Sequence, residues 1–170
     1  MAVRKIEVLP YDPAWAKAFE DIKAELSNAL GSLSLRIEHV GSTSVKGLSA
    51  KPVIDIDVVI ADRSVLGEVI KALGSIGYYH EGDLGITGRE AFGYEGKEHL
   101  MQHHLYVCAK DSEELHRHLA FRDRLRSHPE EVEEYSRIKE EGARLCPNDI
   151  DGYIKYKSPF IERIYKEIKV

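Results

Sequence analysis

The sequence predicts an α/β fold in which helices flank a small mixed β-sheet and the C-terminal third is helical. Two hydrophobic patterns alternate up to about residue 110. Short segments with polar and apolar residues in alternation predict strands, and longer segments with apolar residues three or four apart predict helices. Beyond residue 111 only the helical pattern continues. A chain of 170 residues without an internal linker is expected to form one domain, residues 1–170.

The composition is that of a soluble globular protein, with 43% hydrophobic and 31% charged residues. A formal net charge of −5 argues against broad, non-specific binding to nucleic acid. No apolar run approaches the ~20 residues of a membrane span, and the N-terminus lacks the apolar core of a signal peptide. Cys108 and Cys146 form no metal-binding motif. These features predict a cytoplasmic protein without a membrane partner.

The first elements are predicted from local signals. Ile6 to Leu9 is expected to form a short strand. Asp12 is then placed to cap a helix with Pro13 at its first position, and Gly31 is placed to end it. The buried face of this helix carries Trp15, Phe19, Ile22, Leu26 and Leu30.

Three further strands and one helix are expected in the centre of the chain. Residues 33–40 are predicted to bury Leu33, Leu35 and Ile37, and a second strand follows at 53–60. Residues 61–77 predict a helix, and the glycine-rich segment 78–97 predicts a mobile or ligand-contacting loop. In the strand at 100–108, Leu105 and Val107 should face the core, with His104 and Tyr106 on the other face.

The C-terminal third predicts helices separated by proline. One helix starts near Ser112 and is broken at His128-Pro129, where the next begins. Asn148 is a candidate cap for a final helical region, which Ser158-Pro159 is expected to split because proline is costly inside a helix.

The segment 38–60 contains the candidate site. Asp55 and Asp57 project from one face of an apolar strand, where two close carboxylates are costly unless a cation lies between them. Hard oxygen ligands suit Mg²⁺ or Mn²⁺. Twelve residues upstream, Gly41-Ser42 forms a tight turn whose amides and hydroxyl suit a phosphate. The sequence therefore predicts a phosphate cradle facing a metal-binding acid pair.

Cationic side chains near these motifs are candidates for phosphate contacts. Lys51 precedes the acid strand, and Arg89 presents a bidentate donor from the glycine-rich segment. Three residues of the helical third are further candidates, but solvation or pairing with acids such as Asp123 and Glu130 is the simpler expectation for them: Arg122, Arg126 and Lys157.

The histidines invite a zinc interpretation, but none lies in an H-E-x-x-H motif. His99 and His103 would be too far apart on a strand to chelate one ion. His39 and His104 are instead candidates for lining the pocket.

The arrangement Gly-Ser, twelve residues, then Asp-x-Asp resembles the signature of the nucleotidyltransferase superfold. Over a longer stretch, from about Tyr11 to Tyr165, the chain resembles the GrpB family, which is assigned to that superfold and has some members fused to dephospho-CoA kinase. The resemblance rests on the segments HVGSTSVKGLSAKPVIDIDVVI, GDLGITGREAF, HHLYV, AFRDRLRSHPEEVEEYSRIKEE and YIKYKSPFI.

The resemblance implies a metal-dependent enzyme that moves a nucleoside monophosphate from a nucleoside triphosphate to an unidentified acceptor, a small molecule rather than nucleic acid. It assigns the metal to Asp55 and Asp57 and the phosphates to the Gly41-Ser42 turn. Catalytic members of the superfold usually carry a third carboxylate on a later strand, where this chain offers His104. An inactive module that binds a nucleotide or a CoA-like ligand is therefore the first alternative, and a metal-dependent hydrolase is the second.

Overall fold

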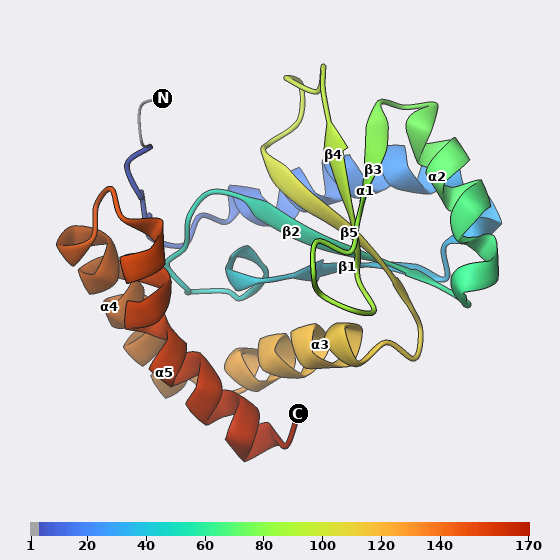
Figure 1. Cartoon of the computed structure of the whole chain (residues 1–170). Coiled ribbons are helices and arrows are strands. Elements are labelled where there is room, and N and C mark those ends of the chain that lie inside the picture. The colour runs from blue at the N-terminus through green and yellow to red at the C-terminus, as the bar shows by residue number, and fades with distance from the viewer. Residues whose placement is uncertain (1–3) are drawn as a thin grey trace.

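The computed structural model describes residues 4–170 and is built on a five-stranded mixed sheet (Figure 1). The strand order is β1-β2-β5-β4-β3. The two central strands β2 and β5 are parallel, and every other neighbouring pair is antiparallel. The strands are β1 (Arg36–Val40), β2 (Ile54–Ile60), β3 (Tyr78–Gly82), β4 (Glu90–Tyr94) and β5 (His103–Ala109). The predicted α/β class with a small mixed sheet is confirmed.

Two helices cover one face of this sheet, α1 (Ala14–Leu30) and α2 (Leu66–Gly74). The buried face of α1 carries the five apolar residues that the periodicity indicated. Facing them, Ile54, Ile56 and Val58 of β2 are fully buried. Leu105 and Val107 of β5 belong to the same cluster, as the alternation predicted. This arrangement leaves the opposite face of β2 to the two aspartates.

The remaining helices, α3 (Glu113–Arg126), α4 (Pro129–Leu145) and α5 (Ile150–Ile168), confirm the helical C-terminal third. In Figure 1, α3 runs below the sheet, and α4 and α5 lie together to one side of it. A second apolar cluster joins them to the segment that follows β1, and its buried members are Val45, Leu48, Leu125, Val132, Tyr135, Phe160 and Ile164. None of the helices in residues 4–170 has the combined length and hydrophobicity of a transmembrane span.

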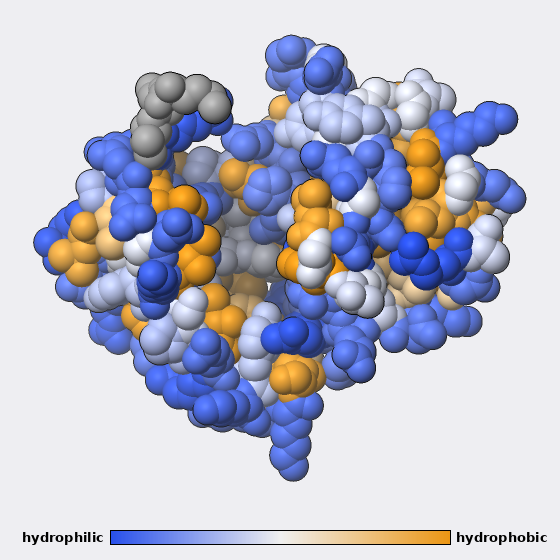
Figure 2. Space-filling model, in the orientation of Figure 1, coloured by the Kyte–Doolittle hydropathy of each residue, from blue (hydrophilic) through white to orange (hydrophobic). Residues whose placement is uncertain are grey.

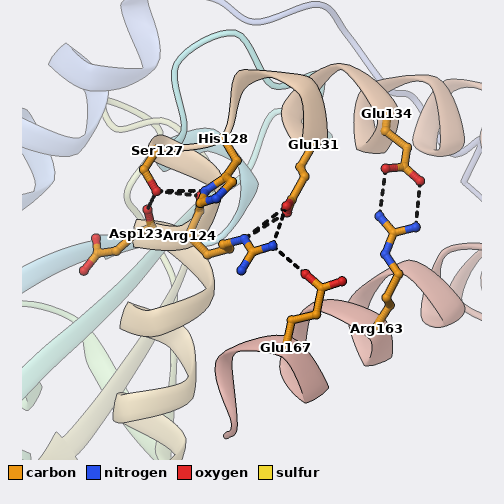
Figure 3. Close-up of polar contacts among 8 residues, drawn as sticks. All are labelled: Asp123, Arg124, Ser127, His128, Glu131, Glu134, Arg163 and Glu167. Atoms are coloured by element: carbon orange, nitrogen blue, oxygen red, sulfur yellow. Dashed lines mark hydrogen bonds and ion pairs between the residues drawn. The ribbon is translucent and has the colours of Figure 1, made fainter.

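Ion pairs hold the three C-terminal helices together (Figure 3). Arg124 of α3 donates to Glu131 of α4 at 2.6 Å and to Glu167 of α5 at 2.5 Å. A second pair, Arg163 with Glu134 at 2.7 Å, joins α5 to α4. The network therefore fixes where α4 and α5 lie relative to α3, and through α3 relative to the sheet.

Two predicted strands are wrong in part. Residues 6–9 form only an isolated bridge, Leu9 with Ala50, because no longer run of partner backbone lies beside them. The strand predicted over 33–40 begins at Arg36, after a short 3₁₀ turn over Gly31–Leu33, so Leu35 is exposed. The alternation of apolar and polar residues begins in the sequence at Leu33, within the 3₁₀ turn, whereas strand pairing begins only at Arg36.

The segment predicted as one loop, 78–97, forms the antiparallel pair β3 and β4 instead. Most of its glycines lie in the connection and at the strand ends. Three residue pairs join the two strands before a bulge between His80 and Gly82, and a fourth pair, Gly82 with Ala91, follows it. The helix predicted over 61–77 is shorter, with a 3₁₀ turn at Arg63–Val65 before α2.

Some helix ends also depart from prediction. At the start of α1 the prediction holds in substance: Asp12 accepts a hydrogen bond from the Ala14 amide at 2.9 Å, and Pro13 has helical dihedral angles. Asp149, one residue after the predicted Asn148, caps α5. Pro159 lies inside a continuous α5, where buried residues on both sides of it hold the helix together: Tyr153, Phe160 and Ile164. The predicted helix start near Ser112 is confirmed, and the Ser112 side chain caps α3 by accepting a hydrogen bond from the Leu115 amide.

Candidate functional site

The two aspartates of β2 point to the face opposite the main core. The parallel register places Asp55 beside His104 and Asp57 beside Tyr106 of β5. The side chain of Asp55 is 32% exposed, whereas that of Asp57 is 0% exposed. One carboxylate is therefore open to a ligand, and the other lies beneath protein atoms.

Asp55 is held between His104 and the backbone of Gly41. Nδ1 of His104 donates to Oδ1 of Asp55 at 3.0 Å. A Cβ atom on Gly41 would lie 2.2 Å from Oδ2 of Asp55, and the φ of Gly41 is 72°. Both the contact and the positive φ require glycine here. The Gly-Ser turn is thus packed directly on the first aspartate.

Asp57 is covered by α3. Nδ1 of His118 donates to Oδ2 of Asp57 at 2.6 Å, and Glu114 lies 3.2 Å from the other ring nitrogen of His118. Burial raises the pKa of Asp57, and the hydrogen bond from His118 only partly offsets this effect. Burial by itself lowers the pKa of His118, but the hydrogen bond and charge of Asp57 outweigh it and raise that pKa.

The other oxygen of Asp57, Oδ1, is buried and has no hydrogen-bond partner within residues 4–170. A buried carboxylate oxygen without a partner is costly, and a bound cation would satisfy it. Together with the open carboxylate of Asp55, this oxygen gives a donor set that suits a hard divalent ion. The acid pair therefore fits Mg²⁺ or Mn²⁺.

A pocket of about 160 Å³ opens beside Asp55 and carries three lysines. Its polar lining combines Asp55 and His104 with Ser42, Thr43, Lys51, Lys139 and Lys157. Lys139 comes from α4 and Lys157 from α5, so the pocket forms where the C-terminal helices meet the sheet. Figure 2 shows the molecule hollowed between these helices and the sheet.

The lysines are held close together by burial and aromatic contacts. Lys139 is only 3% exposed and donates to the hydroxyl of Ser42. The ammonium groups of Lys51 and Lys157 lie 5.7 and 5.0 Å from the ring centre of Tyr153.

Burial also makes the charged forms of these lysines costly. It lowers the pKa of Lys139 well below its ordinary value, with the charge of Lys157 adding to the effect. It lowers the pKa of Lys157 to about 8, helped by the charge of Lys51. An anion in the pocket would reverse this cost, because it favours the charged lysines.

The structure brings together five residues of the predicted site: Gly41, Ser42, Lys51, Asp55 and His104. Arg89 lies elsewhere, with its guanidinium 4.1 Å from the ring centre of Tyr106, on the side of Asp57. Among the further candidates, Lys157 lines the lysine pocket.

The other two further candidates, and the pocket-lining candidate His39, have structural partners. Arg122 pairs with Glu38 at 2.7 Å and with Asp123 at 2.9 Å. Arg126 donates to the Ser44 carbonyl at 2.8 Å instead of pairing with Glu130. His39 stacks on Phe19, with ring centres 4.6 Å apart.

Sequence reasoning missed Lys139 and His118. Lys139 follows the apolar stripe of α4 that includes Val132 and Tyr135, so a lysine on a buried helix face was the available signal. His118 lies 61 residues from Asp57, and no local pattern joins the two.

A cluster that resembles a metal site lies outside this region, at His128, Glu130 and Glu131. Glu131 already pairs with Arg124, and Nδ1 of His128 lies 2.8 Å from the Arg124 carbonyl (Figure 3). The cluster belongs to the network that joins the helices.

Comparison with known proteins finds relatives that match nearly the whole chain. The chain is 32% identical to the UPF0157 protein YqkA of Bacillus subtilis over 98% of its length, and it spans 48% of that relative. The crystal structure of the conserved protein GrpB from Enterococcus faecalis superimposes with a TM-score of 0.83 at 35% identity, covering 95% of this chain and 96% of that one.

A more distant likeness concerns the fold alone. A crystal structure of the Cid1 poly(U) polymerase matches 78% of this chain and 45% of its own length, with a TM-score of 0.53 at 11% identity. The fold is thus nucleotidyltransferase-like. The model of the family described as GrpB protein matches residues 5–167, and the chain belongs to the GrpB family.

Proposed function

We propose that this chain binds a nucleoside triphosphate with Mg²⁺ or Mn²⁺ and transfers its nucleotidyl group to an acceptor. The observation that carries this proposal is the lysine pocket beside the acid pair. Lys139 is a buried lysine that lies in no salt bridge of the described chain, and it contacts the serine of the Gly-Ser turn. Cationic groups gathered beside a carboxylate that remains accessible suit a phosphate chain that ends at a metal.

The acid pair would hold the cation through Asp55 and the unpartnered Oδ1 of Asp57. When bound, such an ion screens charge on the α-phosphate and lowers the pKa of an attacking hydroxyl. His118 keeps the carboxylate of Asp57 in place from the α3 side.

The remaining groups bind and orient the phosphates. Ser42, Lys51, Lys139 and Lys157 surround the space in which the β- and γ-phosphates would lie. Since Arg89 stacks on Tyr106 and does not line the lysine pocket, we assign the phosphate contacts to the lysines in its place.

In the transfer step, an acceptor oxygen or nitrogen forms a bond to the α-phosphorus. The bond from that phosphorus to the oxygen bridging to the β-phosphate breaks, and pyrophosphate leaves with the electron pair. Because Nδ1 of His104 donates to Asp55, its Nε2 is free to accept the acceptor's proton.

One observation favours a second function, a nucleotide-binding module without chemistry. On β5, the residue in register with Asp55 is His104, a neutral ligand where a third carboxylate would add negative charge. Fewer carboxylates would weaken the hold on a second metal ion. The two functions share the lysine pocket and differ in whether product forms.

The first experiment is a titration of ATP, GTP, CTP and UTP, each with and without Mg²⁺ or Mn²⁺, followed by thermal unfolding and calorimetry. Ligands of the folded state raise its apparent stability. We expect metal-dependent binding of at least one triphosphate, lost in the double variant Asp55→Asn, Asp57→Asn. Lys157→Met should weaken binding at least tenfold, and Lys155→Met, an exposed lysine two residues away on α5, should not.

Binding that survives the double aspartate variant, or no binding of any triphosphate, would refute the proposal. To separate the two functions, α-labelled triphosphate is incubated with the chain and a pool of small metabolites. A labelled product that requires Asp55 supports transfer, and binding without product at every nucleotide supports the module.

A further inference from the structure

The face of the sheet that carries the acid pair continues beyond His104 across β4 and β3. Cross-strand partners point to the same face of a sheet. Asp57 is in register with Tyr106, Tyr106 with Ala91, and Tyr79 with Gly93. The strand partners of Asp55 and Asp57, which are His104 and Tyr106, both line a second hollow of about 410 Å³.

The hollow has a flat floor and aromatic sides. Its floor is formed by Gly93, which has no side chain, and by the small side chain of Ala91. The ring of Tyr79 lies across Gly93, where a Cβ atom would meet it at 2.5 Å. The rings of His104 and Tyr106 stand on β5 with their centres 6.4 Å apart. A space bounded by aromatic rings and small residues accepts a planar ring by stacking.

Two exposed apolar side chains border this space. Tyr79 is 52% exposed and Leu84 is 62% exposed. Leu84 has a φ of 51°, a conformation that side-chain-bearing residues seldom adopt. A large apolar residue held exposed in a strained turn is costly unless a ligand covers it.

The hollow differs in charge from the lysine pocket. Among the described residues, its lining includes no lysine or arginine and one carboxylate, that of Glu81. Arg89 stacks on Tyr106 without lining the hollow. Binding of a nucleic-acid strand relies on lysine and arginine at the phosphates, so this surface does not suit one. It suits a neutral or cationic ring.

We propose that this hollow binds the acceptor, and that the acceptor is a small planar molecule, neutral or cationic, with a hydroxyl or amine as nucleophile. The inference rests on the proposed nucleotidyl transfer. His104 lines both the lysine pocket and the hollow, so a ring stacked on the exposed face of Tyr79 would bring its nucleophile towards the open carboxylate of Asp55. The acceptor's O–H or N–H bond breaks as its bond to the α-phosphorus forms, and pyrophosphate leaves.

The experiment compares two probes that share a ring and differ in charge, tryptamine and indole-3-acetate. Each is titrated into the chain with and without ATP and Mg²⁺, and amide resonances are followed by NMR. We expect tryptamine to bind at least tenfold more tightly, with shifts at Gly93 and its neighbours. A short oligouridylate should not displace it.

Two variants locate the binding. Tyr79→Ser should weaken tryptamine binding about tenfold, while Tyr156→Ser, a partly exposed tyrosine on α5, should leave it unchanged. Gly93→Ala should weaken binding as well, because its new methyl group displaces the flexible end of the Tyr79 ring and not the backbone. Gly93→Ala keeps the test valid if Tyr79→Ser does not fold.

Several results would overturn the assignment: equal binding of the two probes, tryptamine binding that Tyr79→Ser leaves unchanged, or displacement by the oligouridylate. ATP binding is measured in the same samples. Metal-dependent ATP binding without tryptamine binding refutes the acceptor site alone. Absence of binding by ATP, GTP, CTP and UTP alike refutes the proposed transfer, and with it the acceptor role, whichever probe binds.

Discussion

Asp55 and Asp57 stand two residues apart on the same face of one strand, yet their surroundings differ completely. Asp55 is 32% exposed, adjoins the three-lysine pocket and pairs with the solvent-exposed His104. Asp57 is 0% exposed and is covered by His118 from α3. The difference comes from the helices that cover the sheet, since α3 closes over Asp57 while α4 and α5 leave a pocket at Asp55. The difference indicates that the Asp55 side is accessible to a ligand and that the contacts at Asp57 contribute to the stability of the fold.

The largest expected effect tests that division directly. His118→Ala leaves the carboxylate of Asp57 buried without its partner, so the free energy of unfolding at pH 7 should fall by about 3 kcal/mol. His104→Ala removes a largely exposed partner of Asp55 and should cost about 0.5 kcal/mol. Urea unfolding of both variants measures the contrast, and equal losses would show that the two sides do not differ in this way.

A glycine variant tests the close packing on the Asp55 side. In Gly41→Ala the new Cβ atom would lie 2.2 Å from Oδ2 of Asp55, at a φ of 72°. We expect a loss of about 3 kcal/mol from backbone strain and overpacking together. Gly31→Ala is the control, because Gly31 also has a positive φ and nothing lies within 4 Å of its Cβ position. It should lose about 1 kcal/mol. Similar losses in the two variants would rule out the contact with Asp55.

Substitution of Lys139 should raise the stability of the fold and weaken ligand binding. Its burial without a carboxylate partner costs stability, so Lys139→Met should raise the free energy of unfolding without ligand by about 1 kcal/mol. The same variant should weaken metal-dependent triphosphate binding about a hundredfold, through loss of charge-assisted hydrogen bonds. Calorimetric titration and urea unfolding measure the two quantities. A Lys139→Met protein that is less stable and binds normally would give this lysine a structural role only.

The smallest expected effect is on the pH dependence of stability, to which His39 and His118 should contribute with opposite signs. Burial, with the charge of Arg126, lowers the pKa of His39 to about 4 from 6.5, so its contribution is present above pH 6.5 and is lost as the pH falls towards 4. The pKa of His118 is raised, so its contribution is present below pH 6.5 and is lost as the pH rises through the folded value.

Between pH 7.5 and pH 5, His39→Gln should therefore lose about 1 kcal/mol less stability than the unmodified chain. His118→Gln should fall further behind the unmodified chain as the pH drops over the same range. Unfolding curves at both pH values give the two differences, and a shared sign for the two variants would contradict the assigned pKa directions.

Several elements were predictable because their signals are local. The periodicity of α1, the alternation in β2 and β5 and the helix start near Ser112 each depend on residues a few positions apart. The family and its fold were predicted from ordered motifs and confirmed by the match over residues 5–167 and by the structural likenesses. Predictions failed where a partner segment decides the outcome. The strand predicted at residues 6–9 forms only an isolated bridge, and the loop predicted at 78–97 forms a pair of strands. The break predicted at Pro159 does not occur, because buried residues on both sides of it hold α5 together.

The sequence by itself determined the strand that carries Asp55 and Asp57, the Gly41-Ser42 turn, the helical C-terminal third and the family. These follow from backbone periodicity and from short motifs, which need no knowledge of distant segments. Only the tertiary structure decided which aspartate is open. It also decided that Lys139 and Lys157 reach the pocket of Ser42 and that Arg89 stacks on Tyr106 and does not line that pocket. The physical reason is that helix packing joins side chains dozens of residues apart. The apolar cluster shared by α3, α4 and α5, together with the ion pairs around Arg124, stabilises that packing through contacts that no local pattern specifies.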